Sequence, residues 1–177
     1  MKVKRFFLVL FIIALLLNPY SESLYRTNAV LFMASHYALF TLGLWMGLNG
    51  SRKFWIGKLC LGCAITVLVH TPAIFDISAY DYAVRLLVEV ALLCAGFLVG
   101  SSLPGNNKVT YSLLGGWMGG DTALSIAFIL GDSVYAYPSS PYPVWQIRDT
   151  GMFMFILMDV VAFFLIMKIF ISYVEKA

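Results

Sequence analysis

Residues 147–172 read IRDTGMFMFILMDVVAFFLIMKIFIS, and this stretch decides the fold class. A helix needs about 20 consecutive, mainly apolar residues to cross the hydrocarbon core of a bilayer, and this run is long enough. The whole chain is 61% hydrophobic and 12% charged, whereas a soluble domain carries about 25% charged residues. We therefore expect an integral membrane protein, because a soluble globule of this composition would lack a polar surface.

Five further apolar stretches precede this one, separated by turn-forming residues such as Asn18-Pro19 and Thr71-Pro72. Only helices satisfy such backbones in lipid without partner strands, and the ten-residue alternation of a barrel does not occur. The sequence predicts one all-α domain over 1–177, an integral membrane bundle of six transmembrane helices at 5–18, 28–49, 54–72, 81–101, 109–131 and 147–172. The first stretch resembles a signal peptide, but no small-x-small cleavage site follows it, so we expect a retained span or signal anchor.

Lysine and arginine are distributed unevenly between the two ends of these spans. One end collects nine of them: Lys2, Lys4, Arg5, Arg52, Lys53, Lys58, Lys108, Lys168 and Lys176. The other end collects Arg26, Arg85 and Arg148. Because cytoplasmic loops carry the excess of basic residues, we expect a multi-pass protein of the cell membrane with the N- and C-termini in the cytoplasm.

Glycines recur at the spacing that lets helix backbones approach closely. Gly43 and Gly47 form one GxxxG pair, and the run of Gly115, Gly116, Gly119 and Gly120 forms a doubled version. The spacing predicts packing within the chain or against a partner subunit.

Ionisable side chains inside the predicted spans are the main functional signal, because such groups are costly in lipid and usually serve a function. The candidate metal site consists of His36, His70, Met33, Glu89 and Asp149. The candidate intramembrane polar network consists of Arg85, Glu89, Asp121 and Asp159. Arg85 and Glu89 lie one helical turn apart, the spacing of an internal ion pair. The alternative for His36 is a buried histidine with a structural role.

The donor types favour copper over haem b, although they do not fix the cofactor. Imidazole, carboxylate and thioether groups suit copper, zinc or iron, and methionine favours Cu(I). Haem b uses two histidines at matching depth, whereas the positions of His36 and His70 predict a difference of several ångströms. The three cysteines, Cys60, Cys63 and Cys94, form a second candidate Cu(I) site, or else pack as small hydrophobic residues.

Several motifs resemble the CtaG-type family of cytochrome oxidase assembly factors linked to copper supply. The matching segments are Met33-Ala-Ser-His36-Tyr, Val69-His70-Thr-Pro72, Arg85-Leu-Leu-Val-Glu89 with Gly96, Tyr142-Pro143, and Arg148-Asp149-Thr-Gly151-Met-Phe-Met154. They follow the family's order over residues 28–165. The chain looks closest to an uncharacterised archaeal branch of six-span membrane proteins, and Glu89 stands where the family has histidine. The resemblance implies a role near copper or terminal oxidases, with His36, His70 and Asp149 as the carried-over polar positions.

We therefore expect an accessory or assembly subunit of a membrane-bound respiratory metalloenzyme complex, of the terminal oxidase type and handling copper. The expected partners are the lipid bilayer and other membrane subunits, and the net charge of +3 gives no indication of nucleic acid. No self-contained catalytic motif occurs, so we do not expect an enzyme. The alternatives are a small b-type cytochrome or quinone-reactive subunit with His36 and His70 as haem ligands, and a purely structural subunit.

Overall fold

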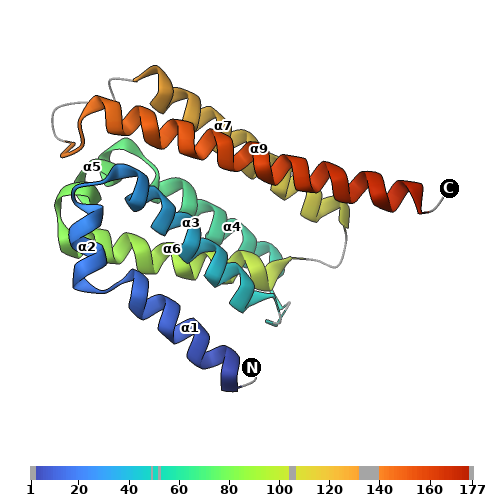
Figure 1. Ribbon diagram of the computed structural model, residues 1–177. Coiled ribbons are helices and arrows are strands. Elements are labelled where there is room, and N and C mark those ends of the chain that lie inside the picture. Colours follow the sequence, from blue (N-terminus) through green and yellow to red (C-terminus); the bar gives the residue numbers. More distant parts are fainter. Residues whose placement is uncertain (1–2, 49, 52, 104–106, 132–139, 176–177) are drawn as a thin grey trace.

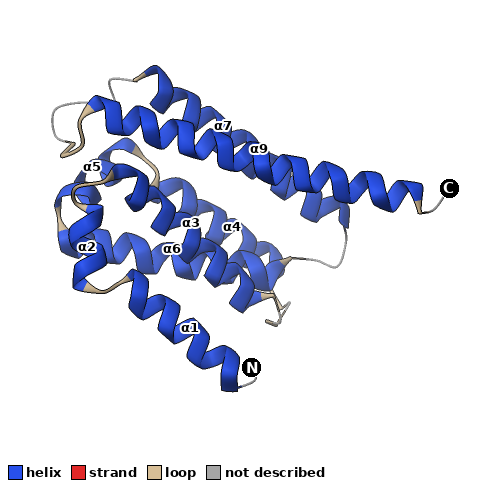
Figure 2. Ribbon diagram, in the orientation of Figure 1, coloured by secondary structure: helices blue, strands red, loops and turns tan. Residues whose placement is uncertain are grey.

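A computed structural model describes residues 3–48, 50–51, 53–103, 107–131 and 140–175. Every regular element in these ranges is an α-helix, and none is a strand (Figure 2). The helices are α1 (Val3–Leu16), α2 (Pro19–Tyr25), α3 (Ala29–Gly47), α4 (Trp55–Val69), α5 (Pro72–Tyr80), α6 (Tyr82–Ser102), α7 (Asn107–Leu130) and α9 (Val144–Val174).

Four helices, α3, α6, α7 and α9, are long and apolar enough to cross a membrane by themselves. Two helix pairs reach that length only together. These are residues 7–16 with α2, bent by 48°, and α4 with α5, bent by 66°. The prediction of an all-helical fold is thus confirmed, and the described residues contain four helices that could span a membrane, or six candidate spans if each bent pair is one span.

The two bends occur at the prolines that we expected to end the first and third spans. Each proline instead begins a short helix, α2 at Pro19 and α5 at Pro72. Proline is well tolerated at the first helical position, because its missing N–H would have no partner there. Asn18 caps α2, since its side chain accepts hydrogen bonds from the backbone N–H of Tyr20 and Ser21 at 2.9 and 3.1 Å. The expected connecting segments 19–27 and 73–80 are therefore largely helical.

The closest helix pair is α3 with α6, and glycines make this approach possible. A Cβ added to Gly43 or Gly47 would overlap the α6 backbone, and one added to Gly96 or Gly100 would overlap the α3 backbone. The predicted GxxxG pair of α3 is thus confirmed as packing within the chain. Its counterpart, Gly96-x-x-x-Gly100 on α6, is equally visible in the sequence, but we had not interpreted it as a packing motif.

Helices α7 and α9 form a second layer beside α3, α4 and α6 (Figure 1). They pack mainly against each other, and α9 also contacts α3. Figure 1 shows both chain ends lying away from the end of the bundle that carries α2 and α5. The four glycines of α7 behave differently from those of α3, since an added Cβ at Gly115, Gly116, Gly119 or Gly120 would meet nothing within 4 Å.

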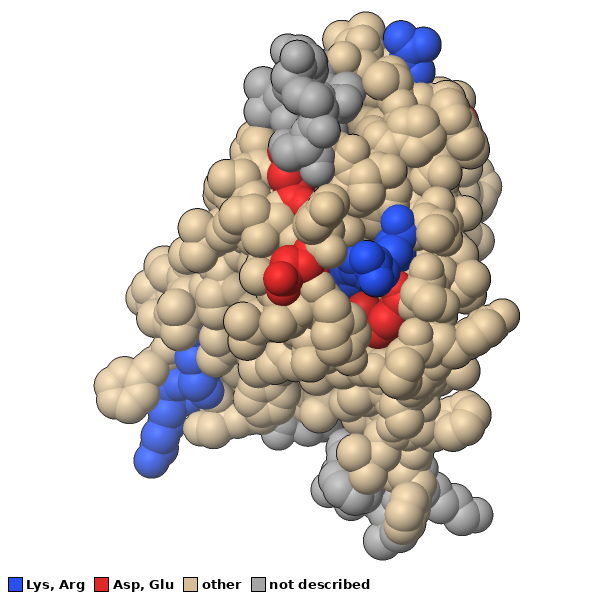
Figure 3. Space-filling model, turned by 90° about the vertical axis from the view of Figure 1, so that its left-hand side faces the viewer, with Lys and Arg blue, Asp and Glu red and all other residues tan. Residues whose placement is uncertain are grey.

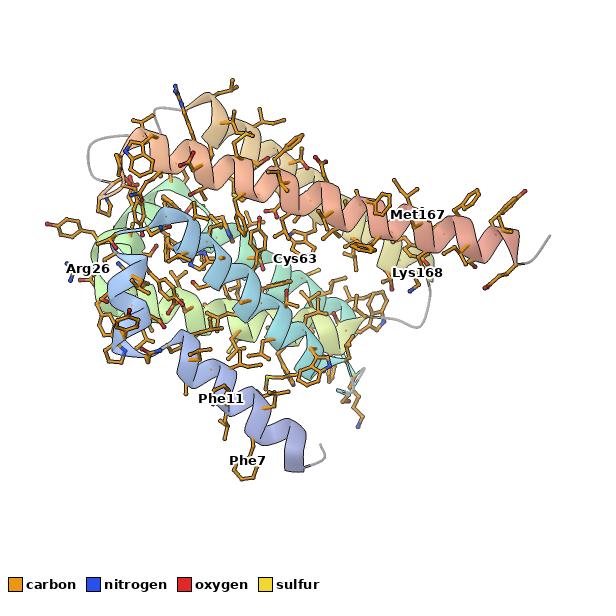
Figure 4. The ribbon with its side chains drawn as sticks, viewed as in Figure 1. Phe7, Phe11, Arg26, Cys63, Met167 and Lys168 are labelled. Atoms are coloured by element: carbon orange, nitrogen blue, oxygen red, sulfur yellow. The ribbon has the colours of Figure 1, made fainter. Side chains whose placement is uncertain are left out.

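The outer surface is apolar over most of the molecule. Phe7 and Phe11 extend from α1 away from the other helices (Figure 4) and are 64% and 65% exposed. Phe163 and Phe164 on α9 are similarly exposed, by 60% and 66%. Figure 3, which faces the end that carries α2 and α5, shows charged side chains near the centre of this face and a few others toward its edges, among mostly uncharged ones. Such a surface matches lipid or other apolar helices rather than water.

Candidate functional site

The two histidines of the chain meet inside the helix bundle. His36 lies on α3 and is 4% exposed, and His70 is the C-cap residue of α4. Their ring centroids are 5.9 Å apart, with the ring planes at 85°. The predicted difference in depth is therefore small enough for the rings to lie edge to face. The bend after α4 explains this, because it ends that helix beside the middle of α3.

Different contacts hold the two imidazole rings. The Nδ1 atom of His70 lies 2.7 Å from the carbonyl oxygen of Thr66, one turn back along α4. A carbonyl only accepts, so Nδ1 carries the proton, and in the neutral ring the lone pair is on Nε2. On His36, by contrast, neither ring nitrogen has a hydrogen-bond partner among the described residues, although both are buried. The ring of Phe32 packs against the imidazole of His36, with 4.4 Å between the two ring centroids.

Both imidazoles line a cavity of about 440 Å³ between α3, α4 and α7. Most of its wall is apolar, and it also includes Met33. On the α7 side the wall is formed by Gly116, Trp117, Gly120 and Asp121. The Tyr37 hydroxyl, which also faces the cavity, donates a hydrogen bond to Asp121 Oδ2 at 2.6 Å. The cavity therefore combines an apolar wall with two polar pairs, one of imidazoles and one of phenol and carboxylate.

The other residues of the predicted metal site lie elsewhere. Glu89 is fully buried on α6, but it does not line this cavity and instead contacts Ser35. Asp149 is exposed near the start of α9. Asp159, placed in the predicted polar network, is exposed on α9 as well. Of that network, only Asp121 reaches the cavity. Among the described residues, no group of three or more His, Cys, Asp or Glu side chains is arranged to hold a metal ion.

The ion pair of Arg85 differs from the one we expected. Its Nη1 lies 3.5 Å from Oε2 of Glu22 on α2, and this is the ion pair found in the described part of the chain. We had predicted Glu89 as the partner, because it lies one turn away on the same helix. Glu22 lies between the predicted spans 5–18 and 28–49, although Asn18-Pro19 followed by an acidic residue is a typical helix start.

Arg85 also joins the two short helices that follow the bends. Its Nε and Nη2 atoms donate to the carbonyl oxygens of Ser78 and Ala79 at 2.9 and 2.7 Å, near the end of α5. Its Nη1 donates to the carbonyl oxygen of Glu22 at 3.0 Å. Carbonyls at a helix C-terminus have no partner within the helix, so this side chain provides donors for the last carbonyls of α5 and a second donor for the Glu22 carbonyl, which also accepts from the N–H of Arg26.

The three thiols do not form the predicted Cu(I) site. Cys60, Cys63 and Cys94 are all exposed, on α4 and α6, and Figure 4 labels Cys63. They are not buried packing residues either, because their side chains are on the outer, lipid-accessible surface. Before and at the start of α9, Tyr142 is buried and Trp145 is exposed.

A family model described as a protein of unknown function (DUF1404) matches residues 7–172. The match covers nearly the whole chain, so the chain belongs to this family. No curated protein and no solved structure matches it.

Proposed function

We propose that this member of the DUF1404 family is an accessory or assembly subunit of a membrane-bound respiratory metalloenzyme complex, and that it holds Cu(I) between His36 and His70. The observation that supports this proposal most directly is the placement of both imidazoles and the Met33 side chain on one partly open cavity. The likeness of these positions to the motifs of copper-linked oxidase assembly factors points in the same direction.

The residues present fit a soft, low-coordinate ion. Metal–nitrogen bonds are about 2.0 Å, so an ion shared by two imidazoles holds their nitrogens roughly 4 Å apart. Rings whose centroids are 5.9 Å apart reach this separation when both turn a nitrogen edge toward the ion, which requires rotation from the edge-to-face arrangement. The buried His36 nitrogens without a partner supply lone pairs. A thioether such as that of Met33 selects Cu(I). Copper bound there supplies an exchangeable metal for delivery, while the chain's own residues bind it and exclude water.

A second candidate function, a quinone-reactive or haem-binding subunit, is favoured by the shape of the cavity. Glycines form part of its wall, and Trp117 lies beside them with its ring 5.7 Å from that of Phe40. A flat ring with polar edges fits between such a wall and the histidines. The pair of Tyr37 and Asp121, which lines the same cavity, then provides a hydrogen-bonding group for that ring.

We further propose that both chain ends lie in the cytoplasm and that α9 contacts other subunits. The nine-to-three distribution of basic residues supports the orientation. The exposed Asp159 lies mid-way along the 31-residue α9, among apolar side chains. A carboxylate at that position is costly in lipid, and a partner helix would provide it with a polar group.

The test is metal analysis and optical spectroscopy of the purified protein, loaded anaerobically with Cu(I) against a competing chelator. We expect about one tightly held copper per chain in the wild type and in Cys60→Ala, the matched thiol control, and loss of it in His36→Ala and His70→Ala. Copper that persists in both histidine variants overturns the proposal. A Soret band in the purified protein that disappears in His36→Ala replaces it with the haem candidate.

A further inference from the structure

A second polar cluster is buried in the bundle apart from the imidazole cavity. It consists of Glu22 on α2, Ser35 on α3, and Arg85 and Glu89 on α6, each at most 2% exposed. The ring of Phe32 separates it from the imidazoles, since this ring lies 5.5 Å from the Arg85 guanidinium carbon and 4.4 Å from His36. The function proposed above makes no use of this cluster.

The cluster has one cation and two acids. Arg85 contacts Glu22 at 3.5 Å, and one guanidinium compensates one carboxylate. Glu89 is buried in the same cluster, and its carboxyl group is close enough to that of Glu22 to interact with it electrostatically. If both acids were ionised, two like charges would face each other in a medium of low dielectric constant with a net charge of −1, which is strongly unfavourable.

Nearby hydrogen-bond donors do not relieve this excess charge. Three of the Arg85 contacts go to main-chain carbonyls. The single hydroxyl hydrogen of Ser35 goes to the Phe32 carbonyl at 2.7 Å, leaving only a long contact of 3.4 Å with Glu89 Oε1. The Tyr25 hydroxyl donates to the carbonyl of Leu16 and the Tyr142 hydroxyl to that of Tyr25.

Three carboxyl oxygens thus lack a hydrogen-bond partner: both Oε atoms of Glu22, of which Oε2 has only the ion-pair contact with Arg85, and Oε2 of Glu89. A single hydrogen placed between the two acids supplies the missing donor, because a protonated carboxyl group donates one hydrogen bond while a carboxylate only accepts. It also makes the cluster neutral. Glu89 is the acid to carry it, since Glu22 holds the contact with Arg85.

We propose that Glu22 and Glu89 form a buried proton-binding site that holds one proton in a carboxyl–carboxylate hydrogen bond beside Arg85. The charged and titratable groups that face the pair are Arg85 from α6, Tyr25 from α2, and Tyr142. The site makes the chain capable of storing a proton within the helix bundle, independently of any metal bound at the histidines.

Infrared difference spectroscopy of the full chain in lipid nanodiscs at neutral pH tests this proposal. The wild-type-minus-Glu89→Gln difference spectrum should contain a positive protonated carboxyl band that shifts in D₂O. It should contain no carboxylate band. Glutamine keeps an N–H donor toward Glu22, so this variant should fold. Asp159→Asn, which changes an exposed acid, should retain the protonated band.

Glu22→Gln provides the second variant. There Glu89 becomes the only counter-ion of Arg85 and ionises, so the protonated band should again disappear while the carboxylate signal stays constant. Loss of a carboxylate band in Glu89→Gln, or a wild type without any protonated carboxyl band, overturns the proposal. If a variant fails to fold, a wild type without any protonated carboxyl band still overturns the proposal.

Discussion

Replacement of Gly96 by alanine should destabilise the bundle through the contact between α3 and α6. A Cβ at this position would overlap the carbonyl oxygen of Phe40 and lie 2.9 Å from the backbone nitrogen of Leu44. Real Cβ atoms essentially never come closer than 3.0 Å to such atoms, and ordinary contact begins at 3.4 Å. Both obstacles belong to helix backbone, so no side chain can rotate away, and the two helices must separate by several tenths of an ångström or more.

The magnitude follows from two opposing effects. Overpacking of a tight interface costs about 1–3 kcal/mol. Alanine within a helix gains about 0.5–1 kcal/mol over glycine, because glycine loses more backbone freedom on folding. The net expectation is a destabilisation of about 1–2 kcal/mol. The reciprocal variant at Gly43 should behave alike, since its Cβ would overlap the carbonyl oxygen of Leu93 on α6.

The matched control is Gly119→Ala on α7, where an added Cβ meets nothing within 4 Å. We expect this variant to be unchanged or more stable by up to about 1 kcal/mol. The assay is thermal or denaturant unfolding of all variants in one detergent, followed by tryptophan fluorescence. Equal midpoints for the Gly96 and Gly119 variants would refute the close approach of α3 and α6.

Two further substitutions test how the ends of the bundle are held together. Arg85→Met should destabilise the chain by about 3–5 kcal/mol, because Glu22 loses its counter-ion and carbonyls at two helix ends lose a hydrogen-bond donor. The control is Arg26→Met at an exposed position, which should leave the midpoint of the same unfolding assay unchanged. Gln146→Leu should lower the free energy of unfolding by about 1–3 kcal/mol. The Gln146 side chain donates to the carbonyl of Thr27 at 3.0 Å and accepts from the buried N–H of Ala29 at 3.1 Å. If the amide hydrogen of Ala29 exchanges as slowly in the variant as in the wild type, this prediction is wrong.

The long apolar helices could be predicted from the sequence because hydrophobic length is a local property. The predicted span 28–49 corresponds to Ala29–Gly47, and 81–101 to Tyr82–Ser102. The bends were harder to predict, because a proline that ends one helix can equally begin another. Whether Pro19 and Pro72 end a span or kink it depends on the partners available to the freed backbone groups. Before Pro19, the carbonyls of Leu15 and Leu16 accept hydrogen bonds from the side chains of Asn18, Ser21 and Tyr25.

The candidate site could be predicted only in part, because the sequence indicates which groups are ionisable but not which groups they contact. His36 and His70 were recognised as a pair because ionisable groups inside apolar segments are rare. Their partners depend on helix rotation, which the sequence determines only weakly. Asp159 and Asp149 face outward, whereas Glu22 faces inward, and each contradicts an expectation based on position along the chain alone.

Both buried polar sites depend on the two bends. The bend at Pro72 ends α4 at His70, and so places that imidazole beside the middle of α3 rather than in a loop. The bend at Pro19 turns α2 inward, so that Glu22 reaches Arg85 and Glu89. Arg85 then donates to carbonyls of both α2 and α5, and thereby fixes the two bent segments relative to α6. Straight spans would separate the histidines and expose Glu22. The kinks are therefore the feature of this sequence that converts an apolar helix bundle into one with polar groups held at its centre.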